Sequence, residues 1–144
     1  MPSAAVKRVE FDPKQDIIDR IGDLSKVEIA QNEVLIAVYK RQEKTAGGII
    51  LTHSNLKEDE YQGKVGLVLK IGAACRFERF DVQRNITFGI PVEIHDWVVV
   101  RPSDTWRLDV NGNPGAVDLK DFIWCRLCYD DQIRMKIPDP GMVY

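Results

Sequence analysis

The chain has 144 residues, enough for one domain of ordinary size with little left for a second. Its apolar fraction of 44% beside 29% charged residues is typical of a globular protein, and no run of ~18 apolar residues predicts a membrane span. A net charge of −2, spread over 20 basic and 22 acidic residues without a long block of either sign, argues against nucleic-acid binding.

The N-terminus and the cysteines bear on cellular location. Residues 1–8 are followed by Glu10 and Asp12 instead of an apolar core, so this end does not read as a secretory signal. The three cysteines, an odd number, fit a reducing compartment better than a disulfide framework. We therefore expect a cytoplasmic protein.

Residues 1–30 are expected to form an N-terminal arm followed by a short amphipathic helix. Asp12 offers a side-chain acceptor at the N-cap, Pro13 suits the first helical position, and Gln15 lies three residues after the cap. Gly22 is a plausible stop. The apolar residues at helical spacing are Ile17, Ile18 and Ile21. We favour packing of this apolar face on the parent domain over binding of a partner.

From residue 27 onward the pattern changes to that of β-strands. The expected strands are 27–30, 34–39, 61–72 and 122–129, with a turn followed by a buried strand over 92–100 and a short edge strand at 132–137. Between them lie a polar connection at 44–61 and a poorly periodic insertion at 73–91, and a proline-stiffened tail follows at 138–144. Short strands, long connections and almost no helix predict a mainly β protein, a small irregular antiparallel β-barrel or sandwich.

The segment 45–52 stands out within the polar connection. It reads Thr45-Ala46-Gly47-Gly48-Ile49-Ile50-Leu51-Thr52 and places three large apolar residues directly after two glycines. Apolar triplets are usually strands, so an edge strand of the chain's own barrel is one interpretation. The glycine pair and the polar residues that follow favour the other, a segment that docks in a partner's groove.

This order of parts resembles the GroES-type co-chaperonins over roughly residues 32–137. Three pieces carry the resemblance: Gly47-Gly48-Ile49-Ile50-Leu51-Thr52, then Gln62-Gly63-Lys64-Val65 with Lys70-Ile71-Gly72, and finally Val92-Glu93-Ile94-His95-Asp96-Trp97-Val98-Val99-Val100 in the place of the family's valine-x-x-glycine-aspartate turn and strand. The resemblance implies a β-barrel over 31–137 with a mobile loop at 44–61. It also implies a homo-oligomer, a seven-fold dome-shaped ring that caps a chaperonin.

The resemblance also implies the site. The glycine hinge corresponds to Gly47 and Gly48, and the docking tripeptide to Ile49, Ile50 and Leu51, which would bind between two apical helices of an ATP-hydrolysing chaperonin. Burying an Ile or Leu yields ~1.5–3 kcal/mol, so three side chains offset the ordering of the loop and leave weak affinity per subunit. Repetition around a ring strengthens such contacts. The protein would be a non-enzymatic partner in folding.

Four features depart from the family pattern. Residues 1–30 precede the barrel, 73–91 stands where a roof hairpin would be, the turn reads His95-Asp96 in place of Gly-Asp, and the tail 138–144 is added. A divergent relative, including a virus-encoded one acting in the host cytoplasm or the virion, would show these changes. They leave an alternative function open: a GroES-like structural protein of a larger assembly such as a virus particle, as a capsid, decoration or connector component.

Other patterns that could carry chemistry are weaker. Cys125 and Cys128 have the spacing of a metal knuckle or redox pair, but residues three apart on a strand point to opposite faces. Cys75, His53 and His95 are isolated and complete neither a ligand set nor a nucleophilic motif. We expect structural cysteines, no metal, no cofactor and no catalytic residue. The fold also resembles the catalytic domain of zinc alcohol dehydrogenases, an enzyme class we reject because the dinucleotide-binding half and the ligand set are missing.

Overall fold

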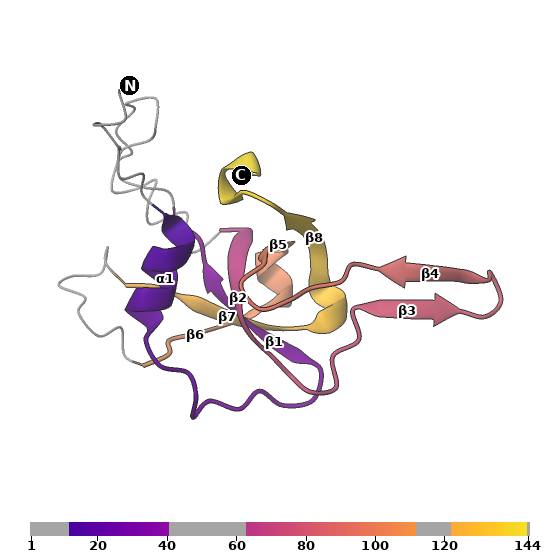
Figure 1. Ribbon diagram of the computed structural model, residues 1–144, viewed down its shortest axis with the longest axis horizontal. Coiled ribbons are helices and arrows are strands. Elements are labelled where there is room, and N and C mark those ends of the chain that lie inside the picture. The colour runs from indigo at the N-terminus through magenta and orange to yellow at the C-terminus, as the bar shows by residue number, and fades with distance from the viewer. Residues whose placement is uncertain (1–11, 41–62, 112–121, 144) are drawn as a thin grey trace, which may run out of the picture.

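The computed structural model describes residues 12–40, 63–111 and 122–143. Its elements are α1 (Pro13–Ile21), β1 (Glu33–Val38), β2 (Val65–Ile71), β3 (Glu78–Asp81), β4 (Ile86–Gly89), β5 (Trp97–Val100), β6 (Trp106–Leu108), β7 (Cys125–Tyr129) and β8 (Ile133–Ile137), with short 3-10 turns η1 (Pro102–Asp104), η3 (Asp130–Gln132) and η4 (Pro140–Met142). The predicted mainly β fold with one short N-terminal helix is confirmed (Figure 1).

Six strands form one sheet in the order β6-β7-β1-β2-β5-β8, and every neighbouring pair is antiparallel. The predicted edge strand is β8, which pairs with β5 alone among the described residues. No ladder in this part of the chain joins β6 to β8, so the sheet is not hydrogen-bonded into a closed barrel. Register shifts between Leu35 and Ile36 and between Val99 and Val100 make the sheet irregular, as expected for this fold class.

Both faces of the sheet carry a hydrophobic core, and this accounts for the unbroken apolar run of β1. Successive residues of a strand point to opposite faces, and residues 34–38 are all at most 1% exposed. One core includes Leu35, Leu67 and Trp97 and takes in the helix. The other includes Ile36 and Val98 and is covered by segments that flank the β3–β4 hairpin.

Helix α1 forms where the sequence predicts it and packs on the sheet. Oδ1 of Asp12 accepts hydrogen bonds from the backbone N of Lys14 at 3.0 Å and of Gln15 at 3.4 Å. Gly22, with φ 79°, ends the helix. Ile17 and Ile21 are 4% and 1% exposed in the first core, which confirms that the apolar face belongs to this domain.

The turn before β5 keeps a tight conformation without a glycine. His95 has φ 72°, in the left-handed region, and its backbone N donates to the carbonyl oxygen of Val68 at 2.7 Å. The carboxylate of Asp96 accepts a hydrogen bond from the backbone N of Glu93 at 2.8 Å and closes the turn. Histidine thus occupies a conformation that glycine adopts without steric cost.

Replacing His95 by glycine is therefore expected to raise the free energy of unfolding by about 1 kcal/mol, because the left-handed conformation costs a residue with a Cβ roughly that amount. Urea denaturation followed by tryptophan fluorescence measures the change. The matched control is Ile94→Gly, an exposed position in the same turn without a positive φ, which is expected to lower stability. A loss of stability in both variants would contradict the prediction.

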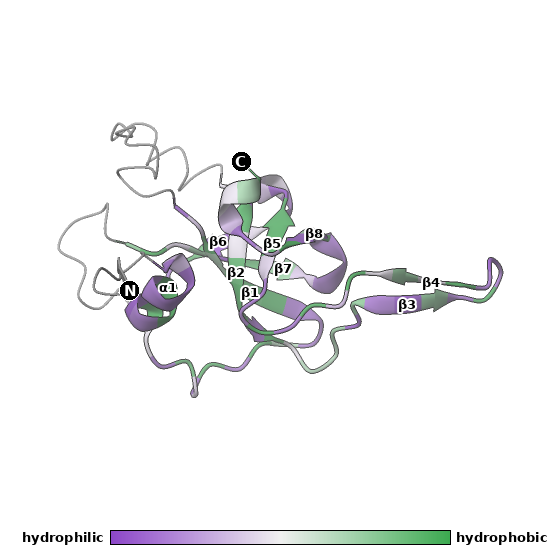
Figure 2. Ribbon diagram, turned by 45° about the horizontal axis from the view of Figure 1, so that its top comes forward, coloured by the Kyte–Doolittle hydropathy of each residue, from purple (hydrophilic) through white to green (hydrophobic). Residues whose placement is uncertain are grey.

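The insertion at 73–91 is more regular than the sequence analysis expected. Its centre is an antiparallel hairpin, β3–β4, that runs away from the sheet (Figures 1 and 2). The described parts of both strands are mostly exposed on both faces. Because neither side is buried, the sequence shows no alternation of apolar and polar residues that would predict a strand. Gly89, with φ 106°, is required at the base because a Cβ there would collide with the carbonyl oxygen of Phe77. Strand β6 was not predicted either, because its three residues are too few to show a strand pattern.

Candidate functional site

The predicted docking residues, Gly47, Gly48, Ile49, Ile50 and Leu51, lie outside the described residues. The structure does define where their connection begins and ends. The chain is described up to residue 40, after β1, and again from residue 63, before β2. β1 and β2 are antiparallel neighbours at the centre of the sheet, so the connection starts and finishes at the same end of one strand pair.

The two attachment points are fixed to the core. The backbone N of Tyr39 donates to the carbonyl oxygen of Val65 at 2.9 Å, which extends the β1–β2 pairing to the last residues before the connection. The ring of Tyr39 packs edge-on against Trp97, with centroids 5.6 Å apart. Trp97 is only 4% exposed. The base from which the connection departs is thus a packed part of the domain.

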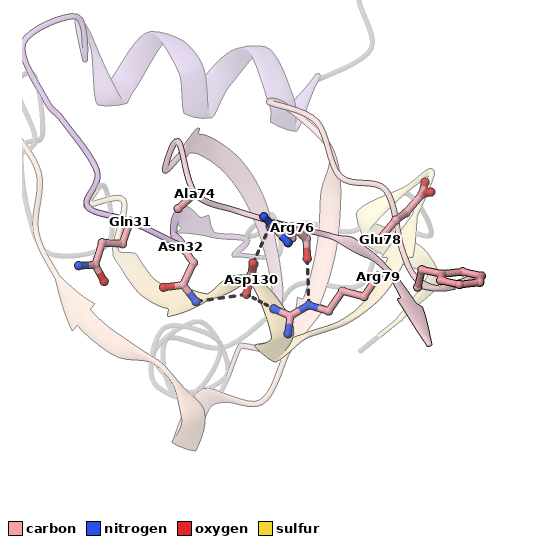
Figure 3. A pocket seen from close by; sticks show the side chains of 8 residues that line it. Gln31, Asn32, Ala74, Arg76, Glu78, Arg79 and Asp130 are labelled. Atoms are coloured by element: carbon pink, nitrogen blue, oxygen red, sulfur yellow. Dashed lines mark hydrogen bonds and ion pairs between the residues drawn. The ribbon is translucent and has the colours of Figure 1, made fainter. Parts of the chain in front are cut away.

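A cluster of hydrogen bonds around the buried carboxylate of Asp130 joins the β3–β4 hairpin to the sheet (Figure 3). The side chain of Asp130 is 1% exposed. Its Oδ2 accepts from the backbone N of Arg76 at 2.7 Å, and its Oδ1 accepts from Nη2 of Arg79 at 3.2 Å and Nδ2 of Asn32 at 3.4 Å. These contacts connect the hairpin base with the start of β1 and the end of β7.

Electrostatics keep this carboxylate ionised. Burial alone would raise the pKa of Asp130, but the hydrogen bonds from Arg76 and Asn32 and the charge of Arg79 together outweigh burial and hold the pKa below its usual range.

The cluster borders an open hollow of about 550 Å³. The hollow is lined by Gln31, Asn32, Ala74, Arg76, Glu78, Arg79, Phe80 and Asp130. Because Asp130 is occupied by internal contacts, its role here is to position the hairpin.

The cysteine pair is structural. Cys125 lies in the core under the helix and Cys128 in the core on the opposite face of the sheet, as the strand geometry predicts. Burial, assisted by nearby negative charge, raises the pKa of each thiol to about 12. Both are therefore protonated at neutral pH and unsuited to metal binding or thiol exchange.

The described ranges hold few other groups that could carry chemistry. They contain no group of three or more His, Cys, Asp or Glu side chains placed to hold a metal ion. No helix within them is long and apolar enough to cross a bilayer. Trp97 is a core residue, whereas Trp106, on β6, is 72% exposed and therefore accessible to a neighbouring molecule.

The open antiparallel sheet, the long connection between its two central strands and the tight turn before β5 define a GroES-like β protein. The family model of the chaperonin 10 Kd subunit matches residues 26–113, more than half of the chain. The protein therefore belongs to this family. The match begins after α1 and ends before β7 and β8. No curated protein matches the chain.

Membership in this family implies co-chaperonin function in general terms: an oligomeric, non-catalytic protein that works with a chaperonin. The residue pattern at 73–91 did not predict the two strands of the hairpin, although the family resemblance places a roof hairpin there, and no pattern predicted the contacts of Asp130. One signal for the hairpin was present, since Asp81 and Asn85 bracket a polar turn between two segments that each contain a phenylalanine. No sequence signal connected Asp130 with Arg79, because 51 positions separate them.

Proposed function

We propose that the protein is a co-chaperonin that forms a ring-shaped lid on a chaperonin and assists the ATP-dependent folding of enclosed clients. The observation that carries the proposal is the family match over residues 26–113, which includes the whole connection between β1 and β2. The attachment of that connection to a packed base supports the proposal, because a docking segment can pull a lid onto its partner only from a fixed point.

Within the connection, Gly47 and Gly48 act as the hinge and Ile49, Ile50 and Leu51 as the docking tripeptide. Glycine permits the backbone change that docking requires. The tripeptide enters an apolar groove of the chaperonin, and the polar residues on either side remain in water. The chaperonin supplies the ATP hydrolysis, so the protein itself needs no cofactor, metal or catalytic residue. We place this activity in the cytoplasm, of the host if a virus encodes the chain.

A ring makes the binding both strong and reversible. Each loop buries few apolar side chains and binds weakly after its ordering cost. With several loops on one ring, every loop after the first binds at a high effective concentration. A small change in the chaperonin's grooves during the ATP cycle weakens all of the loop contacts at once, and the lid dissociates. We propose seven subunits, as the family resemblance implies.

The test is a pull-down of an ATP-cycling chaperonin ring by the full-length protein. Wild type is expected to bind in the presence of ATP, and Ile50→Asp is expected to weaken binding at least 100-fold because the charge must be desolvated in every occupied groove. Ile50→Leu is the matched control and should bind within several-fold of wild type. If wild type fails to bind, or if Ile50→Asp binds equally well, the proposal is wrong.

The structural alternative and the co-chaperonin function differ in whether the protein is released from its partner. A component of a larger assembly such as a virus particle holds its partner permanently, whereas a lid dissociates in each ATP cycle. Chaperonin-bound protein labelled with a fluorophore should therefore exchange with unlabelled protein while ATP is hydrolysed. Absence of the chaperonin complex together with stable incorporation into particles would favour the alternative.

A further inference from the structure

Helix α1 precedes the residues that the family model matches, yet it is built into the core of the domain. Its residues Ile17 and Ile21 are buried in the core that contains Trp97, where the helix packs on the sheet (Figure 1). Tyr39, the penultimate residue described before the 41–62 connection, packs against the same core. The helix and the base of the connection therefore share one set of apolar contacts.

Tyr39 is held at this base from two sides. Its backbone N donates to the carbonyl oxygen of Val65 at 2.9 Å, and its ring lies edge-on to that of Trp97, at an interplanar angle of 78°. Val65 and Trp97 are each 4% exposed and belong to the core on which α1 packs. Because protein interiors are close-packed and transmit strain, a shift of the helix on this core displaces the groups that hold Tyr39. The direction in which the chain leaves the sheet after Tyr39 changes with them.

Asn111 holds the C-terminal end of α1 against the sheet. Its Nδ2 donates to the carbonyl oxygens of Ile21 at 2.8 Å and of Asp23 at 3.0 Å, and so satisfies the carbonyl group of the last helical residue, which has no intrahelical partner. Val110, the residue before it, is 8% exposed in the same core. A helix of nine residues is too short to be stable by itself, so the position of α1 depends on these contacts.

The outer face of α1 carries polar side chains that interact with one another. Gln15 donates from Nε2 to Oδ1 of Asp19 at 2.8 Å, and Arg20 forms an ion pair with Asp16 at 3.0 Å. The buried residues of the helix face the core instead. What α1 contributes to function beyond stability must therefore act through its buried side.

We propose that α1 is a positioning element for the docking connection: it fixes Tyr39 through the shared core and so holds the connection in the direction from which it reaches the chaperonin. The proposal rests on the co-chaperonin function and adds to it a role for residues outside the family match. A segment whose binding-competent orientation is only partly populated binds more weakly in proportion to that fraction. With seven loops on a ring, an about twofold loss of this fraction at each loop weakens binding of the whole ring roughly a hundredfold.

Asn111→Asp tests the proposal with a small change. The carboxylate has nearly the shape of the amide and tolerates the left-handed conformation, φ 59°, but it cannot donate to the two carbonyl oxygens. The full-length variant is expected to bind an ATP-cycling chaperonin ring at least ~10-fold more weakly than wild type in a pull-down titration. Asn85→Asp is the matched control, since it makes the same change at an exposed residue with φ 55° in the β3–β4 turn, and it should bind as wild type does.

A second control separates positioning from general stability. Ile71→Ala removes an apolar side chain that packs against the core on the opposite face of the sheet, at the end of β2 away from the connection. Urea denaturation gives the stability of both variants, and circular dichroism shows whether both are folded in the assay. At an equal or larger loss of stability, Ile71→Ala is expected to keep its chaperonin affinity within several-fold of wild type.

Hydrogen exchange of the Tyr39 amide in the free protein measures the coupling directly. This amide donates to Val65, so its exchange reports the opening of the base. Asn111→Asp is expected to speed the exchange about fivefold or more under conditions where the domain as a whole stays folded, while Asn85→Asp leaves it unchanged. An unchanged rate in Asn111→Asp would show that α1 does not act through Tyr39 and would overturn the proposal.

The outcomes separate this proposal from the proposed function. If wild type and Asn111→Asp bind the chaperonin equally well, the positioning role is wrong and the co-chaperonin function stands. Equal losses of affinity in Asn111→Asp and Ile71→Ala would assign the effect to stability alone and would also overturn the positioning role. If wild type binds no chaperonin, the co-chaperonin function is wrong, and the role of α1 in docking is overturned with it, whatever the exchange of the Tyr39 amide.

Discussion

Replacing Ile17 and Ile21 together by alanine is expected to leave the chain largely unfolded. Both side chains are almost fully buried in the core beneath the sheet. Each Ile→Ala change in such a site costs ~2–5 kcal/mol, and the pair is expected to cost about 6 kcal/mol in total. Domains are typically stable by only ~5–15 kcal/mol, so this loss approaches the whole stability.

Urea denaturation followed by circular dichroism measures this effect. The matched control changes two exposed positions of the same helix, Asp19→Ala with Arg20→Ala, and removes the exposed ion pair between Arg20 and Asp16 at 3.0 Å. It is expected to cost under ~1 kcal/mol. If the core variant loses no more than the control, α1 is an accessory arm. The expected result makes the helix part of the domain, although it precedes the family match at residue 26.

Replacing Asp130 by alanine is expected to cost about 3 kcal/mol. The change removes three hydrogen bonds to a buried carboxylate and leaves the backbone N of Arg76 without its acceptor. The ion pair with Arg79 contributes little of this, since Arg79 is 44% exposed. Asp131→Ala, at the exposed adjacent position, is the control and should be nearly neutral. A loss below ~1 kcal/mol for Asp130→Ala would contradict the assigned role.

This contribution has a defined pH dependence. The pKa of Asp130 is lower in the folded chain than in the unfolded one, where it is about 3.9. The folded state then binds fewer protons in acid, and its stabilisation is complete at neutral pH and falls as the pH drops below about 4. The difference in unfolding free energy between wild type and Asp130→Ala should shrink in that range. A difference that is constant down to pH 3 would show that packing, and not the ionised carboxylate, is responsible.

Much of the fold could be predicted because the signals are local. The N-cap at Asp12, Pro13 at the first helical position and the stop at Gly22 define the nine residues of α1. The apolar, β-branched run at 34–39 predicts a strand, and the structure places it as β1 at the centre of the sheet, where both of its faces are buried. The divergence of Cys125 and Cys128 follows from the two-residue period of a strand.

Other features depended on contacts between distant segments. The residue pattern did not predict the two strands of the hairpin, because neither face of the hairpin is buried in the chain's own core. Asn111 donates from Nδ2 to the carbonyl oxygens of Ile21 at 2.8 Å and Asp23 at 3.0 Å, across roughly ninety positions, and secures the end of α1. No sequence pattern in either segment predicts this contact.

The sequence by itself determined the elements that carry their own period, caps and turn residues, together with the family through the order of those elements. The tertiary structure alone decided where on the sheet α1 packs, how the base of the 41–62 connection is fixed, and that one buried carboxylate orients an exposed apolar hairpin. The physical reason is the distance along the sequence between the residues that determine each feature. Secondary structure is encoded by residues close in sequence, whereas the surroundings of a buried charge are defined by groups that meet only after folding.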